Sequence, residues 1–195
     1  MKKLFFCLPI MITLSAGNLS AQSSYKIATF SGSSFQWVVT SQDIQSVFEH
    51  YVVGTLDEPY GFDNVTIDDD YPTNVDSIAY LVIKANATQS DGKLTLGLRL
   101  TKATSQQIDG AVDFFVRDSL TCRSLEENDE VGWKCKSTTQ NCGGCIKIKS
   151  GGHVVGCHCY ANSSNYCEFE TTGGGGSNWP AWLTALILGL MSLFF

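Results

Sequence analysis

The residues best suited to chemistry are the cysteines. The chain has eight, and seven of them lie between positions 122 and 167: Cys122, Cys135, Cys142, Cys145, Cys157, Cys159 and Cys167. A cysteine thiolate can act as a nucleophile or bind zinc, and two thiols can form a disulfide. Because seven is an odd number, at least one of these cysteines has no disulfide partner among the other six.

Cys142-Gly-Gly-Cys145 has the CxxC spacing found in thiol–disulfide exchange proteins. Redox activity of such a pair needs a lowered thiolate pKa, which a helix beginning after the first cysteine usually supplies. The residues after Cys145 alternate between isoleucine and lysine, which is typical of a strand. The pattern therefore favours a structural role for this pair over an exchange activity.

Zinc binding is the alternative. Cys142, Cys145, Cys157 and Cys159 have CxxC…CxC spacing around a predicted hairpin, which resembles a zinc-ribbon layout. In an exported protein, however, clustered thiols tend to oxidise to disulfides. We therefore expect disulfides and no cofactor, with zinc as the alternative.

Two turn signals predict which cysteines pair. If residues 128–129 and residues 150–152 form the loops of two hairpins, each hairpin places one cysteine opposite another. Opposite Cβ atoms in a sheet lie about 4.5–5.5 Å apart, which is close to the spacing that a disulfide needs. The predicted bonds are Cys122–Cys135 and Cys145–Cys157, and Cys142, Cys159 and Cys167 are left without an assigned partner.

The N-terminal residues predict export. Lys2 and Lys3 precede the apolar run Leu4–Leu14, and small or polar residues follow as far as Ala21. This order is typical of a secretory signal peptide. The apolar run is too short to span a membrane, which takes about 20 apolar residues. We expect residues 1–21 to be removed and the remaining chain to reach an oxidising compartment.

The C-terminal residues predict attachment to a membrane. Residues 179–195 carry no charged side chain and follow a Gly-rich linker at 171–178. As a helix they would be about 25 Å long, against about 30 Å for a hydrocarbon core. A permanent membrane helix and a processed lipid-anchor signal both fit this pattern. A helix buried in the domain fits less well, because the segment is apolar all round and its linker is flexible.

The residues between the two ends predict an α+β fold. Thr40 and Asp43 form a capping-box pattern, and apolar residues then recur at helical spacing over 41–53. We expect residues 22–119 to form an antiparallel sheet with this one amphipathic helix packed on it, and residues 120–170 to form a separate cysteine-rich β module. The predicted strands are 26–30, 35–39, 78–85, 94–101, 112–117, 120–125, 131–136, 146–149 and 153–160.

The charge pattern bounds the partners. The net charge is −6, and it becomes −8 without the signal peptide, which argues against nucleic acid as a partner.

The Asp-rich segment 55–77 lacks the ligand spacing of an EF-hand and is expected to be a solvated loop rather than a Ca²⁺ site. Lysines in the cysteine-rich segment are expected on the wet faces of hairpins, or against an anionic partner. They are Lys134, Lys136, Lys147 and Lys149.

The expected function is a non-enzymatic interaction or structural protein, displayed outside a membrane at the cell surface or envelope. Its expected partners are the membrane, through residues 179–195, and a protein or surface ligand. An exported thiol redox or zinc-binding protein is the alternative. Asn64, Asn86 and Asn162 each begin an Asn-X-Ser/Thr sequence, which matters where the host glycosylates exported proteins.

Overall fold

The computed structural model describes residues 24–117, 130–137, 142, 144–160, 167–173 and 179–195. The predicted signal peptide, Cys122 and the predicted strand 120–125 lie outside these residues. The strands are β1 (Ser24–Ser31), β2 (Ser34–Trp37), β3 (Tyr60–Asp68), β4 (Ala79–Ala87), β5 (Lys93–Thr104), β6 (Val112–Arg117), β7 (Glu130–Ser137), β8 (Cys145–Ser150), β9 (His153–Cys159) and β10 (Cys167–Gly173). The helical elements are α1 (Ser41–Val47), a π-helical turn η1 (Phe48–Val52), a 3-10 turn η2 (Val53–Thr55) and α2 (Ala181–Ser192).

Eight of these strands form one antiparallel sheet around β5. The strand order is β10-β7-β5-β6-β1-β2, and β3 and β4 extend the sheet from β5. This confirms the expected α+β class. The expected boundary at residue 120 does not separate two sheets, because β7 pairs with β5, and β10 pairs with β7. Of the cysteine-rich segment, the β8–β9 hairpin alone forms a sheet of its own among the described strands.

The first helical segment begins as the sequence predicts. The hydroxyl of Thr40 accepts a hydrogen bond from the backbone N–H of Asp43, and the carboxylate of Asp43 accepts one from the backbone N–H of Thr40. This reciprocal capping box satisfies two amide groups that the first turn leaves without partners. Ile44, Val47 and Phe48 are buried against the sheet, so the apolar face of the helix packs where its spacing requires.

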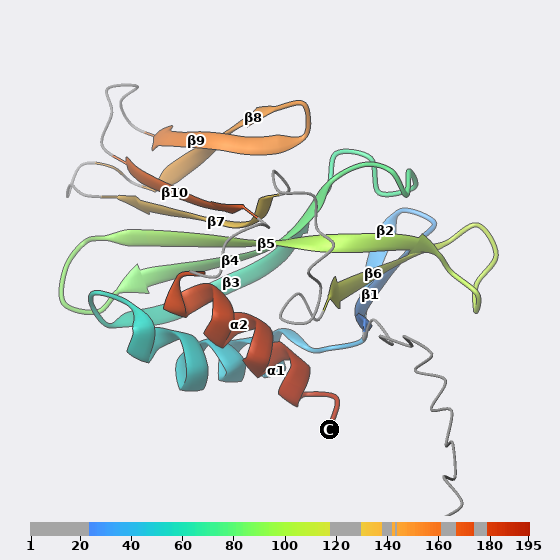
Figure 1. Ribbon diagram of the computed structural model, residues 1–195, viewed down its shortest axis with the longest axis horizontal. Coiled ribbons are helices and arrows are strands. Elements are labelled where there is room, and N and C mark those ends of the chain that lie inside the picture. The colour runs from blue at the N-terminus through green and yellow to red at the C-terminus, as the bar shows by residue number, and fades with distance from the viewer. Residues whose placement is uncertain (1–23, 118–129, 138–141, 143, 161–166, 174–178) are drawn as a thin grey trace, which may run out of the picture.

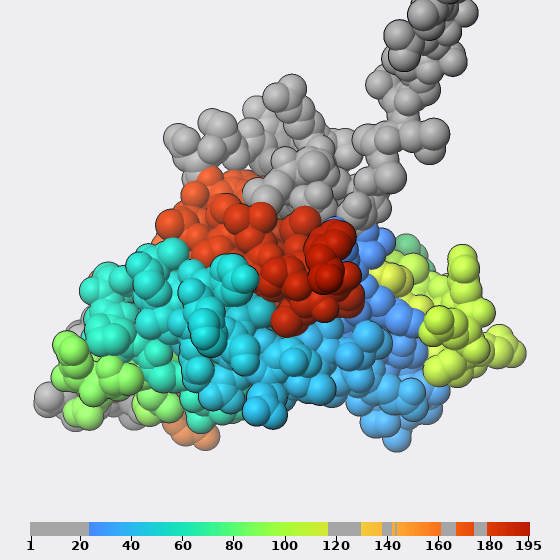
Figure 2. All heavy atoms as spheres, turned by 90° about the horizontal axis from the view of Figure 1, so that it is seen from below, coloured from blue at the N-terminus to red at the C-terminus, as the bar shows by residue number. Residues whose placement is uncertain are grey.

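The C-terminal segment is part of the hydrophobic core. Trp182, Leu183, Leu186, Ile187 and Leu190 of α2 are buried together with leucines of β4 and β5. Figure 2 shows α2 (red) lying against the cyan segment that contains α1 and η1. The two helical segments meet closely at Gly189, where an added Cβ would lie 2.6 Å from Val47 Cγ1. The expectation that the flexible linker keeps this segment off the domain is therefore wrong.

The apolar character that suggested a membrane tail also suits this packing. Burying apolar surface gives about 25 cal/mol per Å² whether the surface meets lipid or a protein core. Among the described residues, no helix combines the length and the apolar character needed to cross a bilayer.

Helices and hairpin cover opposite faces of the sheet (Figure 1). On β4, Leu81 and Ile83 face the helices, whereas Tyr80 and Val82 point to the other side, which we call the hairpin face. Side chains alternate along a strand, so one strand serves two cores. The β8–β9 hairpin rests on the hairpin face.

Trp133 of β7 is the largest side chain of the hairpin face and is fully buried. Its indole ring lies over Gly97 of β5, where a Cβ would come within 2.2 Å of Trp133 Cε2. The two residues are direct partners across the strand pair. β5 therefore has a glycine at position 97, because the ring of Trp133 occupies the space that a side chain at this position would need.

Candidate functional site

Three disulfides hold the β8–β9 hairpin and its flanking segments in place. The bonds are Cys135–Cys157, Cys142–Cys159 and Cys145–Cys167. All six cysteines among the described residues are therefore paired, which agrees with the expectation of disulfides. The partners differ from those predicted: Cys145 bonds to Cys167 instead of Cys157, and Cys135, expected to bond to Cys122, bonds to Cys157.

The register of the hairpin explains the difference. Its loop has two residues, 151 and 152, and their φ angles are positive, 58° and 86°. A loop of three residues, 150–152, was expected. Val155 then adds a bulge in β9, so Cys145 lies opposite Cys159. Each of these changes shifts the pairing by one residue, so together they move the partner of Cys145 from Cys157 to Cys159 without exchanging the faces of the strands. Cys157 is thereby free to reach Cys135 on β7, with Cα atoms 6.2 Å apart.

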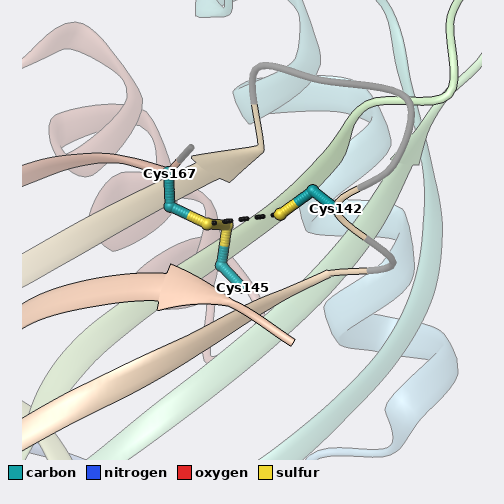
Figure 3. Close-up of side chains that lie close together, drawn as sticks. All are labelled: Cys142, Cys145 and Cys167. Atoms are coloured by element: carbon teal, nitrogen blue, oxygen red, sulfur yellow. Dashed lines mark hydrogen bonds between the residues drawn. A yellow bond between two sulfur atoms is a disulfide. The ribbon is translucent and has the colours of Figure 1, made fainter. Parts of the chain in front are cut away.

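Two of the disulfides lie against each other, and Figure 3 shows Cys142 beside the Cys145–Cys167 bond. The sulfur of Cys167 is 3.6 Å from that of Cys142 and 3.8 Å from that of Cys159. Cys142 and Cys159 are buried, whereas Cys145 and Cys167 are partly exposed. The four sulfurs form a compact cluster of two oxidised pairs.

The zinc alternative requires a different set of cysteines. Its predicted ligands were Cys142, Cys145, Cys157 and Cys159. The structure brings Cys142, Cys145 and Cys167 within 4.8 Å of one another, and Cys157 is bonded to β7 instead. The predicted ligand set is therefore not assembled, and Cys167 takes the place that the spacing pattern gave to Cys157.

The lysines of β8 face the sheet, contrary to the expectation that they lie on a wet face. Lys147 and Lys149 both form ion pairs with Asp68 of β3, and Lys149 also pairs with Asp70 at 2.9 Å. Burial opposes the ionisation of Asp68, but hydrogen bonds from the two lysines outweigh it and lower the pKa of this carboxyl group. Charge complementarity thus adds to the disulfides in fixing the hairpin.

The acidic segment after β3 is also neutralised from within. Asp69 is buried and accepts a hydrogen bond from Lys102 of β5, whose ammonium group also donates to the carbonyl of Tyr71 and the hydroxyl of Ser77. A buried charge needs such a partner. The expectation of a purely solvated acidic loop is therefore corrected: Asp69 anchors this loop to the sheet.

A buried carboxylate lies where β7 begins. Glu130 Oε2 accepts a hydrogen bond of 2.8 Å from the hydroxyl of Tyr80 and lies 3.5 Å from His153 Nδ1. Burial is the main cause that raises the pKa of Glu130, and burial also raises the pKa of the Tyr80 phenol. Tyr80 is completely buried and His153 is partly exposed, so this group of side chains links the core of the hairpin face to the start of β9.

A cavity of about 540 Å³ lies between β8 and the hairpin face. Its floor is formed by β3, β4, β5 and β7, and its opposite wall by residues 144–147 and Tyr160. The volume lies within the range of about 300–1,000 Å³ that is usual for small-molecule sites. The cavity exists because the hairpin is held over the sheet at a fixed distance.

The cavity is lined by polar groups from several strands. They include Thr66, Lys84, Asn86, Thr95 and Trp133. The indole N–H of Trp133 is buried and has no hydrogen-bond partner among the described residues. Because Trp133 is fully buried, its ring supports the floor of the cavity from below, and its N–H does not reach a ligand in the cavity.

No known protein family matches this chain. The search of family models, of curated proteins and of solved structures gave no significant similarity. A function is therefore proposed from the geometry of the described residues.

The cavity was not predicted from the sequence, although one signal for it was present. In β5 the leucines alternate with Lys93, Thr95 and Arg99, which marks a second face that is polar but half-buried. A polar face that is covered indicates a site or an ion-pair layer. What covers that face depends on the position of the hairpin, which the strand pattern does not reveal.

Proposed function

We propose that this protein is an exported, non-enzymatic binding protein, and that the cavity between β8 and the hairpin face is its recognition site. The observation that carries the proposal is the construction of the cavity. A hairpin fixed by three disulfides stands over a cavity whose polar side chains come from several strands.

The covalent fixing of the hairpin favours binding for a physical reason. Ordering a loop around a ligand costs free energy, and a loop that is already ordered avoids this cost. Disulfides persist in oxidising compartments, so they also support the proposed export. The described cysteines are oxidised, and a protein outside the cytosol would keep them so.

Filling the cavity tests this function. Thr66 lies on the edge strand β3 and is exposed, so Thr66→Trp is expected to fold while its ring enters the cavity. A panel of sugars, amino acids, nucleotides and carboxylic acids is screened by thermal shift, because any ligand that binds the folded state raises Tm. We expect at least one compound to raise Tm in the wild-type protein and in the matched control Thr66→Ser, which keeps the hydroxyl, and to have no effect in Thr66→Trp. No stabilising compound, or equal stabilisation of all three proteins, would refute the proposal.

We further propose that α2 attaches the protein to the surface of a membrane. The helix is buried on one side only, and its outer side carries Leu188, which is 45 % exposed; Phe195, which follows the helix, is 95 % exposed. A helix that lies in the interface buries such a face among lipid headgroups and chains. Because the hairpin lies on the other side of the sheet, this attachment would direct the cavity away from the membrane.

Vesicle binding tests the attachment. The whole chain is sedimented with vesicles of phosphatidylcholine and phosphatidylglycerol. We expect Leu188→Asp to lower the bound fraction several-fold, because a charge must then leave water. Val155→Asp is the matched control: Val155 is 54 % exposed on the hairpin, on the opposite side of the sheet. Equal binding of both variants, or no binding of the wild-type protein, would contradict the proposal.

A further inference from the structure

The structure also points to the chemical class of the ligand. We propose that the cavity binds an acidic sugar, a hydroxyl-bearing ring with one carboxylate. This inference rests on the proposed binding function of the cavity and adds the nature of the ligand.

The first argument is the charge of the cavity wall. The lining contains three lysines and two aspartates, namely Lys84, Lys93, Lys147, Asp63 and Asp68. Lys147 is neutralised by Asp68, and Lys93 donates to the side-chain carbonyl of Asn86 at 2.6 Å.

Lys84 differs from these two lysines. It is exposed and forms no ion pair or hydrogen bond with any of the described residues. Its position on β4, next to the floor of the cavity, gives a ligand carboxylate an ammonium group with no competing partner. The wall as a whole has an excess of positive charge, in a protein whose net charge is −6. A positive wall in a negatively charged protein favours a negatively charged ligand at that place.

The second argument is the supply of hydrogen-bond donors. The carbonyl of Asn86 is occupied by Lys93, which leaves the amide N–H groups of Asn86 for a ligand. The hydroxyls of Thr66 and Thr95 can donate or accept. Lys84, Asn86, Thr66 and Thr95 can thus all donate to a ligand, and a ligand rich in hydroxyl and carboxylate oxygens matches this supply.

The third argument is the aromatic ring at the rim. Tyr160 lines the cavity and is 77 % exposed. An exposed phenol offers an apolar ring face with a polar tip. The C–H groups of a sugar ring can pack on such a face while its hydroxyls reach the polar floor. A fatty acid would leave the polar floor without partners, which costs free energy.

Calorimetric titration with defined sugars tests the inference. The probes are glucuronate, galacturonate and N-acetylneuraminate, and the neutral comparison is glucose. The protein is made in a bacterial periplasm, so that the Asn64 and Asn86 sequences carry no glycan. We expect at least one acidic sugar to bind at least tenfold more tightly than glucose, since a hydrogen bond to a charged group contributes more than a neutral one.

Variants of Lys84 make the test specific. Lys84→Gln is expected to lose about tenfold in affinity for the acidic sugar, and Lys84→Arg is expected to keep most of it. The matched control is Lys134→Gln: Lys134 pairs with Glu170 at 2.5 Å and is not among the cavity residues.

Equal affinity of Lys84→Gln and the wild-type protein, or binding of glucose as tight as that of the acidic sugars, would overturn the inference. If no acidic sugar binds but another compound passes the Thr66→Trp test, the ligand class is wrong and the binding function stands. If no compound passes that test, both fail.

Discussion

Removal of residues 178–195 is expected to unfold the protein or to make it aggregate. This segment carries the five large apolar side chains of α2 that are buried in the core, and its loss would expose the leucines of β4 and β5 beneath it. One buried Leu→Ala change usually costs about 2–5 kcal/mol, whereas a whole domain is stable by about 5–15 kcal/mol. A chain that ends at Ser177 should therefore lack a cooperative thermal transition and accumulate in the insoluble fraction.

Two point variants in α2 test whether the packing of this helix, and not merely its presence, stabilises the protein. Leu186 is fully buried, and Leu188, on the same helix, is half exposed. We expect Leu186→Ala to lower the free energy of unfolding by about 2–5 kcal/mol and Leu188→Ala to change it by about 0.5 kcal/mol or less. A chain truncated at Ser177 that stays soluble and melts at the wild-type Tm would show that α2 lies outside the folded unit.

Loss of the Cys135–Cys157 disulfide is expected to destabilise the protein by about 2–5 kcal/mol, as is usual for small disulfide-linked domains. The bond is the direct covalent link between β7 of the sheet and the hairpin. The double variant Cys135→Ser, Cys157→Ser should therefore also weaken any binding in the cavity. Chemical denaturation measures the stability, and Val155→Ser on the outer side of the hairpin is the control that should change little. Unchanged stability of the double variant would contradict the role assigned to this bond.

Non-reducing peptide mapping of the native protein checks the bond pattern itself. The expected cross-linked peptides join Cys135 to Cys157, Cys142 to Cys159 and Cys145 to Cys167. A peptide that joins Cys145 to Cys157 would restore the pairing predicted from the turns. Four or more free thiols in the native protein would instead favour the zinc or redox alternative. The observation that supports this alternative is the contact between the Cys142–Cys159 and Cys145–Cys167 bonds.

The elements with regular patterns could be predicted from the sequence, and the irregular ones could not. The capping box and the alternating leucines of β5 depend on neighbouring residues, so local rules suffice for them. The strand β3 was expected to be loop. It carries a bulge between Phe62 and Asn64, which breaks the period of two, and it contains Asp, Asn and Gly, which are uncommon in strands.

The candidate site depends on distant contacts, which is why the sequence did not reveal it. The inward orientation of Lys147 follows from its pairing with Asp68 on another strand. The isoleucines beside it, Ile146 and Ile148, are exposed as a result. Taken alone, the hairpin sequence predicts the opposite orientation, with isoleucines buried. The free energy lost by exposing these isoleucines is offset by ion pairs and disulfides. These interactions join residues that are far apart in the sequence, so neighbouring residues do not reveal them.

The position of α2 in the chain has a consequence for the order of folding. Every described strand precedes this helix, so a chain that emerges from its N-terminal end exposes the apolar side of β4 and β5 until the last helix arrives. If the chain is exported as proposed, folding would then be completed only after translocation. A chain that cannot close its core early remains extended enough to pass through a secretion channel. Its sheet also needs protection from aggregation during that interval, a task that a chaperone of the receiving compartment could perform.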